Sequence, residues 1–556
     1  MTHNFENRWL APTRIQIILW LVLVSVTLVL ALGNYQTYLL GTHFDDARYV
    51  ILARSLVLSD QYGMINAPGD PPVGKYPFIY PLLLAPFVVL FPHEPDALKL
   101  LSLIATVLNL SLLFWGWRWF SRTRSYWWGL AIAALYGLAP ITIDLTRRVM
   151  SEPVFTTFVL LAIILAERAA QKQPGRGWSV AMSATLVGVL FTRSIGIILI
   201  ACIFFYLILK RGRSFARQLA LIVALMAVIA GIIIATTPVQ LRDLLPSEYL
   251  KDENAGLLLA PVTGVVPTEA GEPSVVTATP PDLMQKIKTV VVDYILVYGI
   301  ENHFGKDMRV IAFPLGGGER EEIFADWLSL PFLPMLLGYM ISALVLFGWV
   351  RQFRQDGLTL LNLFGAVYLA VLFLWVWDDP RLLYPIQPQI HFGFLLGIEA
   401  LVVLIATRAR MDARAWITGI AMVLITLAVF KAAQIEDSRL HTGDIRARTT
   451  WLAHNASPSA IILTEAAEID YLYSERKTLT YPAVASSAQL EEFLRAQKID
   501  FILVAPFIHW QSRYTPTYSN SALKFRDWAD ELVARQRATL VHASESELIR
   551  VYQIKR

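Results

Sequence analysis

Eleven long apolar stretches constrain this chain more than any other feature of its sequence. A helix of about 20 mostly apolar residues crosses the hydrocarbon core of a bilayer. Hydrophobic residues make up 55% of the 556 residues and charged residues only 17%, which is more apolar than an ordinary globular protein. We therefore expect a mainly α polytopic membrane protein with about 11 transmembrane helices, at residues 15–33, 98–118, 127–143, 152–167, 178–192, 194–209, 217–237, 330–350, 358–377, 384–406 and 415–433.

Clusters of Lys and Arg occupy several of the short gaps between these stretches, and such loops stay in the cytoplasm. One consistent orientation follows for a protein of the cytoplasmic membrane. The N-terminus is cytoplasmic, whereas a first loop (34–97), a long loop (238–329) and the C-terminal segment lie on the periplasmic or extracellular side. The clusters lie at 118–124, 168–176, 210–217, 351–354 and 408–414.

The composition becomes that of a soluble protein after the last apolar stretch. We expect a transmembrane domain at 1–433 and a small extracytoplasmic α/β domain at 434–556. Strand-like and helical patterns alternate in the second domain. The strands are expected at 460–464, 500–505 and 548–554, and the helices at 490–496 and 525–537. The net charge of +4 is too small to indicate a nucleic-acid partner, so membrane lipids are the expected surroundings.

Residues 178–209 are continuously apolar, yet basic clusters flank both ends. Two short helices that meet at a tip satisfy the charge rule, and the tip falls at residues 191–196. Arg193 is then a lone cation at or near membrane depth, where an arginine usually has a partner or a function. A side chain that reaches the interface without any function is the alternative.

The first loop carries Asp45-Asp-Ala-Arg-Tyr49 directly after the first apolar stretch. In a helix, Asp45, Arg48 and Tyr49 fall near one face, because residues three and four apart are neighbours. A second carboxylate, Asp46, is adjacent. An acid and a base held beside a membrane surface indicate chemistry, although a solvated amphipathic helix with an ion pair has the same pattern.

Further charged and polar residues are expected on the same outer surface: Glu152, Lys75, Arg193, Arg381 and Tyr384. Glu152 also fits the first turn of a helix, where the helix dipole stabilises a carboxylate. Cations beside an apolar groove suit a lipid-linked phosphate. A carboxylate near an acceptor hydroxyl can act as general base. Together these residues indicate transfer of a sugar from a lipid phosphate.

The motifs resemble the GT-C membrane glycosyltransferases: the bacterial aminoarabinose transferases of lipid A, the lipopolysaccharide-core galacturonosyltransferases (Rgt type) and the protein O-mannosyltransferases. The resemblance covers about residues 15–410. It is carried by Asp-Asp-x-Arg-Tyr (45–49), Lys-x-Pro (75–77), Ser-Glu-Pro (151–153), the two short helices with an Arg between them, and Arg-x-x-Tyr-Pro (381–385).

The resemblance implies a polyprenyl-phosphate sugar donor, inversion at the anomeric carbon, Asp45 as general base with Asp46 beside it, and donor phosphate held by Arg48, Lys75 and Arg193. Tyr49, Glu152, Arg381 and Tyr384 are candidates for substrate binding. No required metal is expected, because members with diphosphate donors carry an extra acidic pair in the second loop, whereas Asp144 and Glu152 are eight residues apart and flank two arginines.

Two departures from the family pattern concern the identity of the sugar. Asp46 stands where the aminoarabinose and mannosyl transferases usually have Glu, and Gly74 rather than an acidic residue precedes Lys75. A transporter or flippase of a lipid-linked glycan is the main alternative function, and an anchor for the C-terminal domain is another. The sequence determines neither the sugar nor the acceptor, which could be a lipid, a glycan or a protein.

Overall fold

The computed structural model describes residues 11–33, 35–41, 45–59, 61–73, 76–121, 126–171, 175, 177–212, 215–239, 333–374, 380–409, 442–506, 518–544 and 548–555. Most of the predicted long loop (240–329) and the predicted span at 415–433 lie outside these residues. Lys75 also lies outside them.

Most of the described residues before 433 are helical, so the mainly α prediction is confirmed for this part. Six helical segments are long and apolar enough to cross a membrane, or seven if the pair α5–α6, bent by 63°, is one span. Pro140 begins α6, and a proline cannot continue the hydrogen bonding of α5. The predicted number of 11 spans stays a prediction. The helices are α1 (Arg14–Gly33), α4 (Leu100–Phe120), α5 (Tyr126–Gly137), α6 (Pro140–Thr146), α7 (Glu152–Gln171), α8 (Trp178–Thr192), α9 (Ile197–Arg211), α10 (Ala216–Thr236), α17 (Leu333–Asp356), α18 (Leu360–Leu374) and α19 (Gln387–Ala409).

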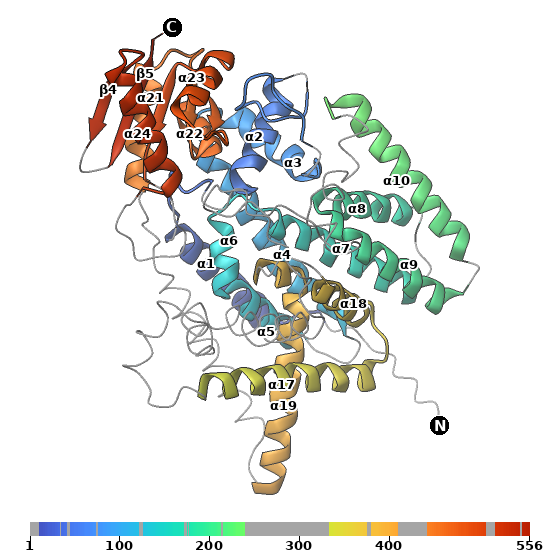
Figure 1. Ribbon diagram of the computed structural model, residues 1–556. Coiled ribbons are helices and arrows are strands. Elements are labelled where there is room, and N and C mark those ends of the chain that lie inside the picture. Colours follow the sequence, from blue (N-terminus) through green and yellow to red (C-terminus); the bar gives the residue numbers. More distant parts are fainter. Residues whose placement is uncertain are drawn as a thin grey trace, which may run out of the picture.

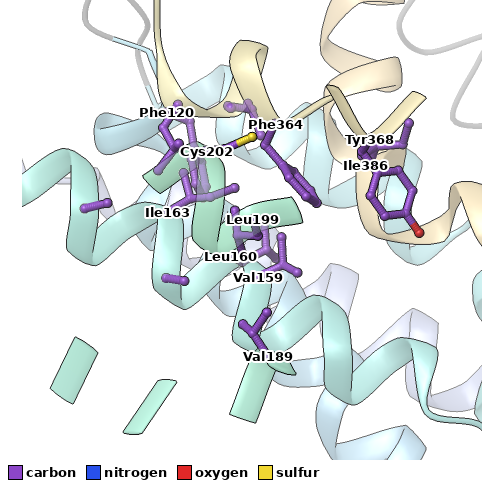
Figure 2. Close-up of a cluster of buried hydrophobic side chains, with 14 of the residues drawn as sticks. Phe120, Val159, Leu160, Ile163, Val189, Leu199, Cys202, Phe364, Tyr368 and Ile386 are labelled. Atoms are coloured by element: carbon purple, nitrogen blue, oxygen red, sulfur yellow. The ribbon is translucent and has the colours of Figure 1, made fainter. Parts of the chain in front are cut away.

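Helix α7 lies at the centre of the helical core. Its side chains Val159, Leu160 and Ile163 pack with apolar residues of α8, α9 and α18 (Figure 2). Cys202 of α9 belongs to this cluster and is buried, as expected for a small apolar side chain. Buried contacts of this kind hold membrane helices together through close packing. The central position of α7 fixes where its first residue, Glu152, lies.

Helices α8 and α9 form the predicted pair of short helices with Arg193 between them. The Trp178 indole at the start of α8 donates to the Leu165 carbonyl of α7 at 3.0 Å. The Arg211 guanidinium at the end of α9 donates to the Ala169 carbonyl, also on α7. Both outer ends of the pair thus lie at the C-terminal end of α7. The extended backbone of Arg193 (φ −149°, ψ 128°) forms the break, at the opposite end of α7.

The first loop contains two helices, α2 (Asp45–Leu58) and α3 (Ile79–Leu90), followed by the 3-10 helix η1 (Pro95–Lys99). The motif is therefore helical from Asp45 onward, as predicted. Helix α3 is apolar along its length. Val89 and Leu90 at its end are exposed, which agrees with a helix that lies at a membrane interface.

The C-terminal segment forms a five-stranded mixed sheet in the order β2-β1-β3-β5-β4, with helices packed on it. Strands β2, β1 and β3 are parallel, while β5 is antiparallel to both β3 and β4. The three predicted strands and two predicted helices are present. Helices α21 and α22 and strands β2 and β4 were not predicted. The elements are α21 (Thr442–Asn455), β1 (Ile461–Thr464), α22 (Ala467–Ser474), β2 (Lys477–Thr480), α23 (Ser487–Ala496), β3 (Phe501–Val504), α24 (Asn520–Ala534), β4 (Ala538–Ser544) and β5 (Ile549–Ile554).

The C-terminal segment rests on the first loop, with α22 beside α2 (Figure 1). Lys477 forms an ion pair with Asp70 at 2.8 Å. The amide of Thr478 donates to the Asn66 carbonyl at 2.7 Å. Because these contacts surround α2, the segment covers the end of the bundle where the Asp45 motif lies.

Candidate functional site

Asp45, the first residue of α2, accepts hydrogen bonds on both carboxylate oxygens. The Tyr76 hydroxyl donates to Oδ1 at 2.7 Å. The Arg381 guanidinium donates to Oδ2 at 3.0 Å. Arg381 belongs to η6 (Pro380–Ile386), so the helix bundle and the first loop meet at this carboxylate. The Asp45 side chain is still 30% exposed, which leaves it open to a ligand.

The surroundings of Asp45 keep its carboxylate ionised. Burial by itself would raise the pKa of Asp45, but the Arg381 charge, the Tyr76 hydrogen bond and the Arg193 charge outweigh burial and hold the pKa below its ordinary value. Nearby cations and donated hydrogen bonds both favour the charged form of an acid. Asp45 is therefore a carboxylate, able to accept a proton, at neutral pH.

Arg48 lies one turn along α2 and shares Tyr76 with Asp45. Its Nη1 donates to the Tyr76 hydroxyl at 3.1 Å, and its Nε donates to Glu468 of α22 at 3.1 Å. The Tyr49 ring packs edge-on against Tyr76. The predicted common face of Asp45, Arg48 and Tyr49 is therefore present.

Arg193 and Glu152 form a close ion pair next to Asp45. Arg193 Nη1 is 2.6 Å from Glu152 Oε1 and 3.1 Å from the Ser151 hydroxyl, to which it donates. Arg381 Nε is 3.8 Å from the same Glu152 oxygen. The Ser151 hydroxyl also meets the Tyr49 hydroxyl at 3.1 Å. Glu152 thus has both roles considered above: it begins α7, and it belongs to the charged cluster.

Asp46, predicted beside Asp45 as a second catalytic carboxylate, does not share the position of Asp45. Its side chain is fully buried and accepts hydrogen bonds from the backbone N–H groups of Gly41 and Ala47, each at 2.9 Å. Burial raises the pKa of Asp46 to about 6, partly offset by the Arg148 charge. In this structure Asp46 fixes the chain at the start of α2, and a catalytic role for it stays a prediction.

Two other candidate residues lie elsewhere or outside the described chain. Tyr384 is buried and packs on Tyr136 of α5, with ring centroids 5.1 Å apart. It therefore belongs to the core between the helices. Lys75 is outside the described residues, although its neighbour Tyr76 lies within the cluster, so donor binding by Lys75 stays a prediction.

Tyr76, Ser151 and Glu468 are members of the cluster that sequence reasoning did not select. Tyr76 is the middle residue of the Lys-x-Pro motif, and Ser151 is the first residue of the Ser-Glu-Pro motif. Their positions within these motifs could have marked them as candidate site residues. Glu468 lies 420 residues from Arg48, and no local pattern marks it.

The cluster can bind an anion and accept a proton. Arg48, Arg193 and Arg381 are partly exposed cations that converge on one place, and guanidinium groups bind phosphate through paired hydrogen bonds. Asp45 is an accessible carboxylate beside them. Within the part of the chain that the structure describes, no three His, Cys, Asp or Glu side chains gather as metal ligands would.

Comparison with known proteins gives one family and several related structures. A family model described as dolichyl-phosphate-mannose-protein mannosyltransferase matches residues 75–236. The crystal structure of apo ArnT from Cupriavidus metallidurans matches at 14% identity, covering 96% of this chain and 97% of that one, with a TM-score of 0.52. A search of curated proteins finds no sequence match.

Two further structures match with a similar score. One is the same ArnT bound to undecaprenyl phosphate, at 13% identity, 97% coverage of both chains and a TM-score of 0.53. The other is the apo oligosaccharyltransferase of Archaeoglobus fulgidus, at 11% identity, covering 88% of this chain and 69% of that one, with a TM-score of 0.51. The expected resemblance is thereby confirmed: the chain is a multi-pass membrane protein with a GT-C fold that resembles the ArnT and protein mannosyltransferase families.

Proposed function

We propose that this protein is an inverting glycosyltransferase that moves a sugar from a polyprenyl-phosphate donor to an acceptor hydroxyl or phosphate at the outer face of the cytoplasmic membrane. The observation that carries the proposal is the Asp45 carboxylate, which is ionised and 30% exposed. It pairs with Arg381, lies within the influence of the Arg193 charge, and is linked to Arg48 through the Tyr76 hydroxyl. The undecaprenyl phosphate bound by the structurally similar ArnT agrees with a lipid monophosphate as the leaving group.

The reaction follows from these positions. For a hydroxyl acceptor, Asp45 accepts the hydroxyl proton as the acceptor oxygen attacks the anomeric carbon. The bond between that carbon and the phosphate oxygen breaks, and its electron pair stays on the phosphate. Arg48 and Arg193 stabilise the additional negative charge of the departing polyprenyl phosphate. Tyr76 and Arg381 engage one lone pair on each Asp45 oxygen, and a carboxylate oxygen has a second one for the proton.

The direct test compares wild-type protein with Asp45→Asn in lipid nanodiscs. Release of polyprenyl phosphate from a panel of polyprenyl-phosphate sugars is measured, with cell-envelope extract as the acceptor source. We expect the variant to lose at least 100-fold in rate, since positioned general bases contribute roughly 10²–10⁴-fold. Full activity in a folded Asp45→Asn protein would refute the proposal. Movement of lipid-linked sugar across liposomes without sugar transfer would instead support a flippase.

A further inference from the structure

Glu468 is the member of the charged cluster that comes from the C-terminal domain. Its carboxylate is 3.1 Å from Arg48 Nε, and the two side chains are 18% and 34% exposed. Arg48 also donates to Tyr76, the residue that hydrogen-bonds Asp45. Glu468 is therefore connected to the proposed base through two residues, Arg48 and Tyr76, and is directly bound to Arg48, a proposed phosphate ligand.

The position of Glu468 is fixed by the docking of α22 rather than by its own ion pair. Its neighbour Ile469 packs against Gly41 so closely that a Cβ at residue 41 would overlap it. Tyr473, on the next turn of α22, donates to Asp96 at 3.1 Å and accepts from the Leu40 amide at 3.2 Å. These contacts hold α22 on the first loop, so Glu468 stays beside Arg48.

Among the described residues of the cluster, the positive and negative charges are equal in number when Glu468 is included. The three arginines Arg48, Arg193 and Arg381 face the three carboxylates Asp45, Glu152 and Glu468. A polyprenyl-phosphate sugar is a phosphodiester with one negative charge, whereas the released monoester gains ionisation with a second pKa near 6. The product is thus more anionic than the donor. A carboxylate held beside the phosphate-binding arginine therefore weakens binding of the product more than binding of the donor.

We infer that Glu468 is a positioning residue of the site that orients Arg48 and promotes release of the polyprenyl monophosphate product. The inference rests on the proposed function. Glu468 and the phosphate compete for the same guanidinium, so the arginine binds the donor phosphate weakly enough for turnover. The C-terminal domain therefore contributes directly to the catalytic cycle through α22.

The inference predicts the effect of Glu468→Gln, which keeps the size of the side chain and removes its charge. A unit charge removed from within a few ångströms of a partly exposed phosphate site changes binding by about 1.4 kcal/mol, or roughly tenfold. We expect the variant to bind undecaprenyl phosphate roughly tenfold more tightly. Under conditions where product release limits turnover, kcat should fall while KM for the donor also falls.

The experiment measures the Kd for undecaprenyl phosphate by native mass spectrometry of wild type, Glu468→Gln and Glu468→Asp. Lys477→Gln is the matched control, because Lys477 forms another ion pair between α22's domain and the first loop but lies outside the cluster. Glu468→Asp should restore wild-type affinity, and the control should not change it. In an Arg48→Gln background, Glu468→Gln should have no further effect on affinity.

The outcomes separate the two proposals. Equal or weaker lipid binding by Glu468→Gln, in a protein whose thermal midpoint matches the control, overturns the role of Glu468 and leaves the glycosyltransferase proposal standing. A wild-type protein that does not bind undecaprenyl phosphate overturns both. Tighter binding by Lys477→Gln as well would assign the effect to loosened domain docking and would also overturn the inference.

Discussion

Arg381→Gln should change the pH dependence of sugar transfer, so that the rate falls at low pH where the wild-type rate does not. Arg381 is the largest of the stabilising influences on the Asp45 carboxylate, followed by the Tyr76 hydrogen bond and the Arg193 charge. Without Arg381, less remains to offset the effect of burial on the carboxylate, so the pKa of Asp45 rises. A base that must be ionised then becomes protonated at a higher pH, so the rate at low pH falls.

The size of the shift follows from the ion-pair geometry. The charged groups are 3.0 Å apart, and at an effective dielectric constant of about 20 two unit charges at that distance attract by about 5 kcal/mol. The side chains are 23% and 30% exposed, so solvent screens the pair, and about 2 kcal/mol is a reasonable value for this site. Removal of Arg381 should therefore raise the pKa of Asp45.

The assay is kcat/KM for polyprenyl phosphate release between pH 4 and pH 9. The wild-type pKa of Asp45 lies below 3.8, so wild type should show no acid limb caused by this residue above about pH 5. In Arg381→Gln the rate should fall at the acid end of this range, because the pKa of Asp45 rises when the Arg381 charge is removed. Arg351→Gln is the matched control, because Arg351 pairs with Glu399 at 3.0 Å with similar exposure, 25% and 22%. A variant that is uniformly slower but has the wild-type pH profile would refute the role of Arg381.

Three further predictions concern stability. Burial raises the folded-state pKa of Asp46 to about 6 from 3.8, so the folded state binds that proton more tightly, and stability should fall by up to about 3 kcal/mol as the pH rises from 4 to 6. In thermal unfolding, Asp46→Asn should not lose stability over this pH range. Parallel curves of stability against pH for wild type and variant would contradict the prediction. Gly41→Ala should lower the free energy of unfolding by about 2–4 kcal/mol, because φ is +96° and the new methyl group overlaps a side chain of α22. Gly69→Ala, with φ +79° and open space, should lose only about 1 kcal/mol in the same denaturant series, and equal losses would refute the packing argument. Glu167→Gln should lose about 1–3 kcal/mol, since buried Glu167 accepts two hydrogen bonds at 2.7 Å, and an unchanged thermal midpoint would contradict this.

Local sequence patterns predicted the parts of the fold that depend on nearby residues. The apolar runs indicated the helices, and the basic flanks of 178–209 indicated a break at Arg193. The three-and-four spacing of Asp45, Arg48 and Tyr49 indicated a common face. Each of these inferences used residues within about one helix of each other, where geometry is set by the regular backbone.

The same helical geometry explains why Asp46 does not share the position of Asp45. Successive residues of an α-helix are rotated by about 100°, so adjacent residues do not face the same site. A pair Asp45-Asp46 at the start of a helix can therefore present only one carboxylate to a ligand. The other has to be satisfied by the protein, and Asp46 is bound by the amides of Gly41 and Ala47.

Partners distant along the chain could not be predicted from one sequence. Arg381 is 336 residues from Asp45, and Glu468 is 420 residues from Arg48. Their meeting depends on how η6 packs on α7 and how α22 docks on α2. Strands β2 and β4 were missed because both lie at the edges of the sheet and neither has the continuous apolar run that marks the buried strands β1 and β3.

The charge pattern explains why Glu152 has to be buried where it is. Arg193 and Arg381 both lie within 4 Å of one Glu152 oxygen, and without that carboxylate two guanidinium groups would face Asp45 alone. Two cations in a partly dry site repel each other and lose solvation. Glu152 supplies a negative charge to both Arg193 and Arg381, so the two cations do not depend on Asp45 alone for neutralisation. The carboxylates of this site thus have separate tasks, set by burial: Asp46 fixes the chain, Glu152 holds the arginines, and the exposed Asp45 is left for chemistry.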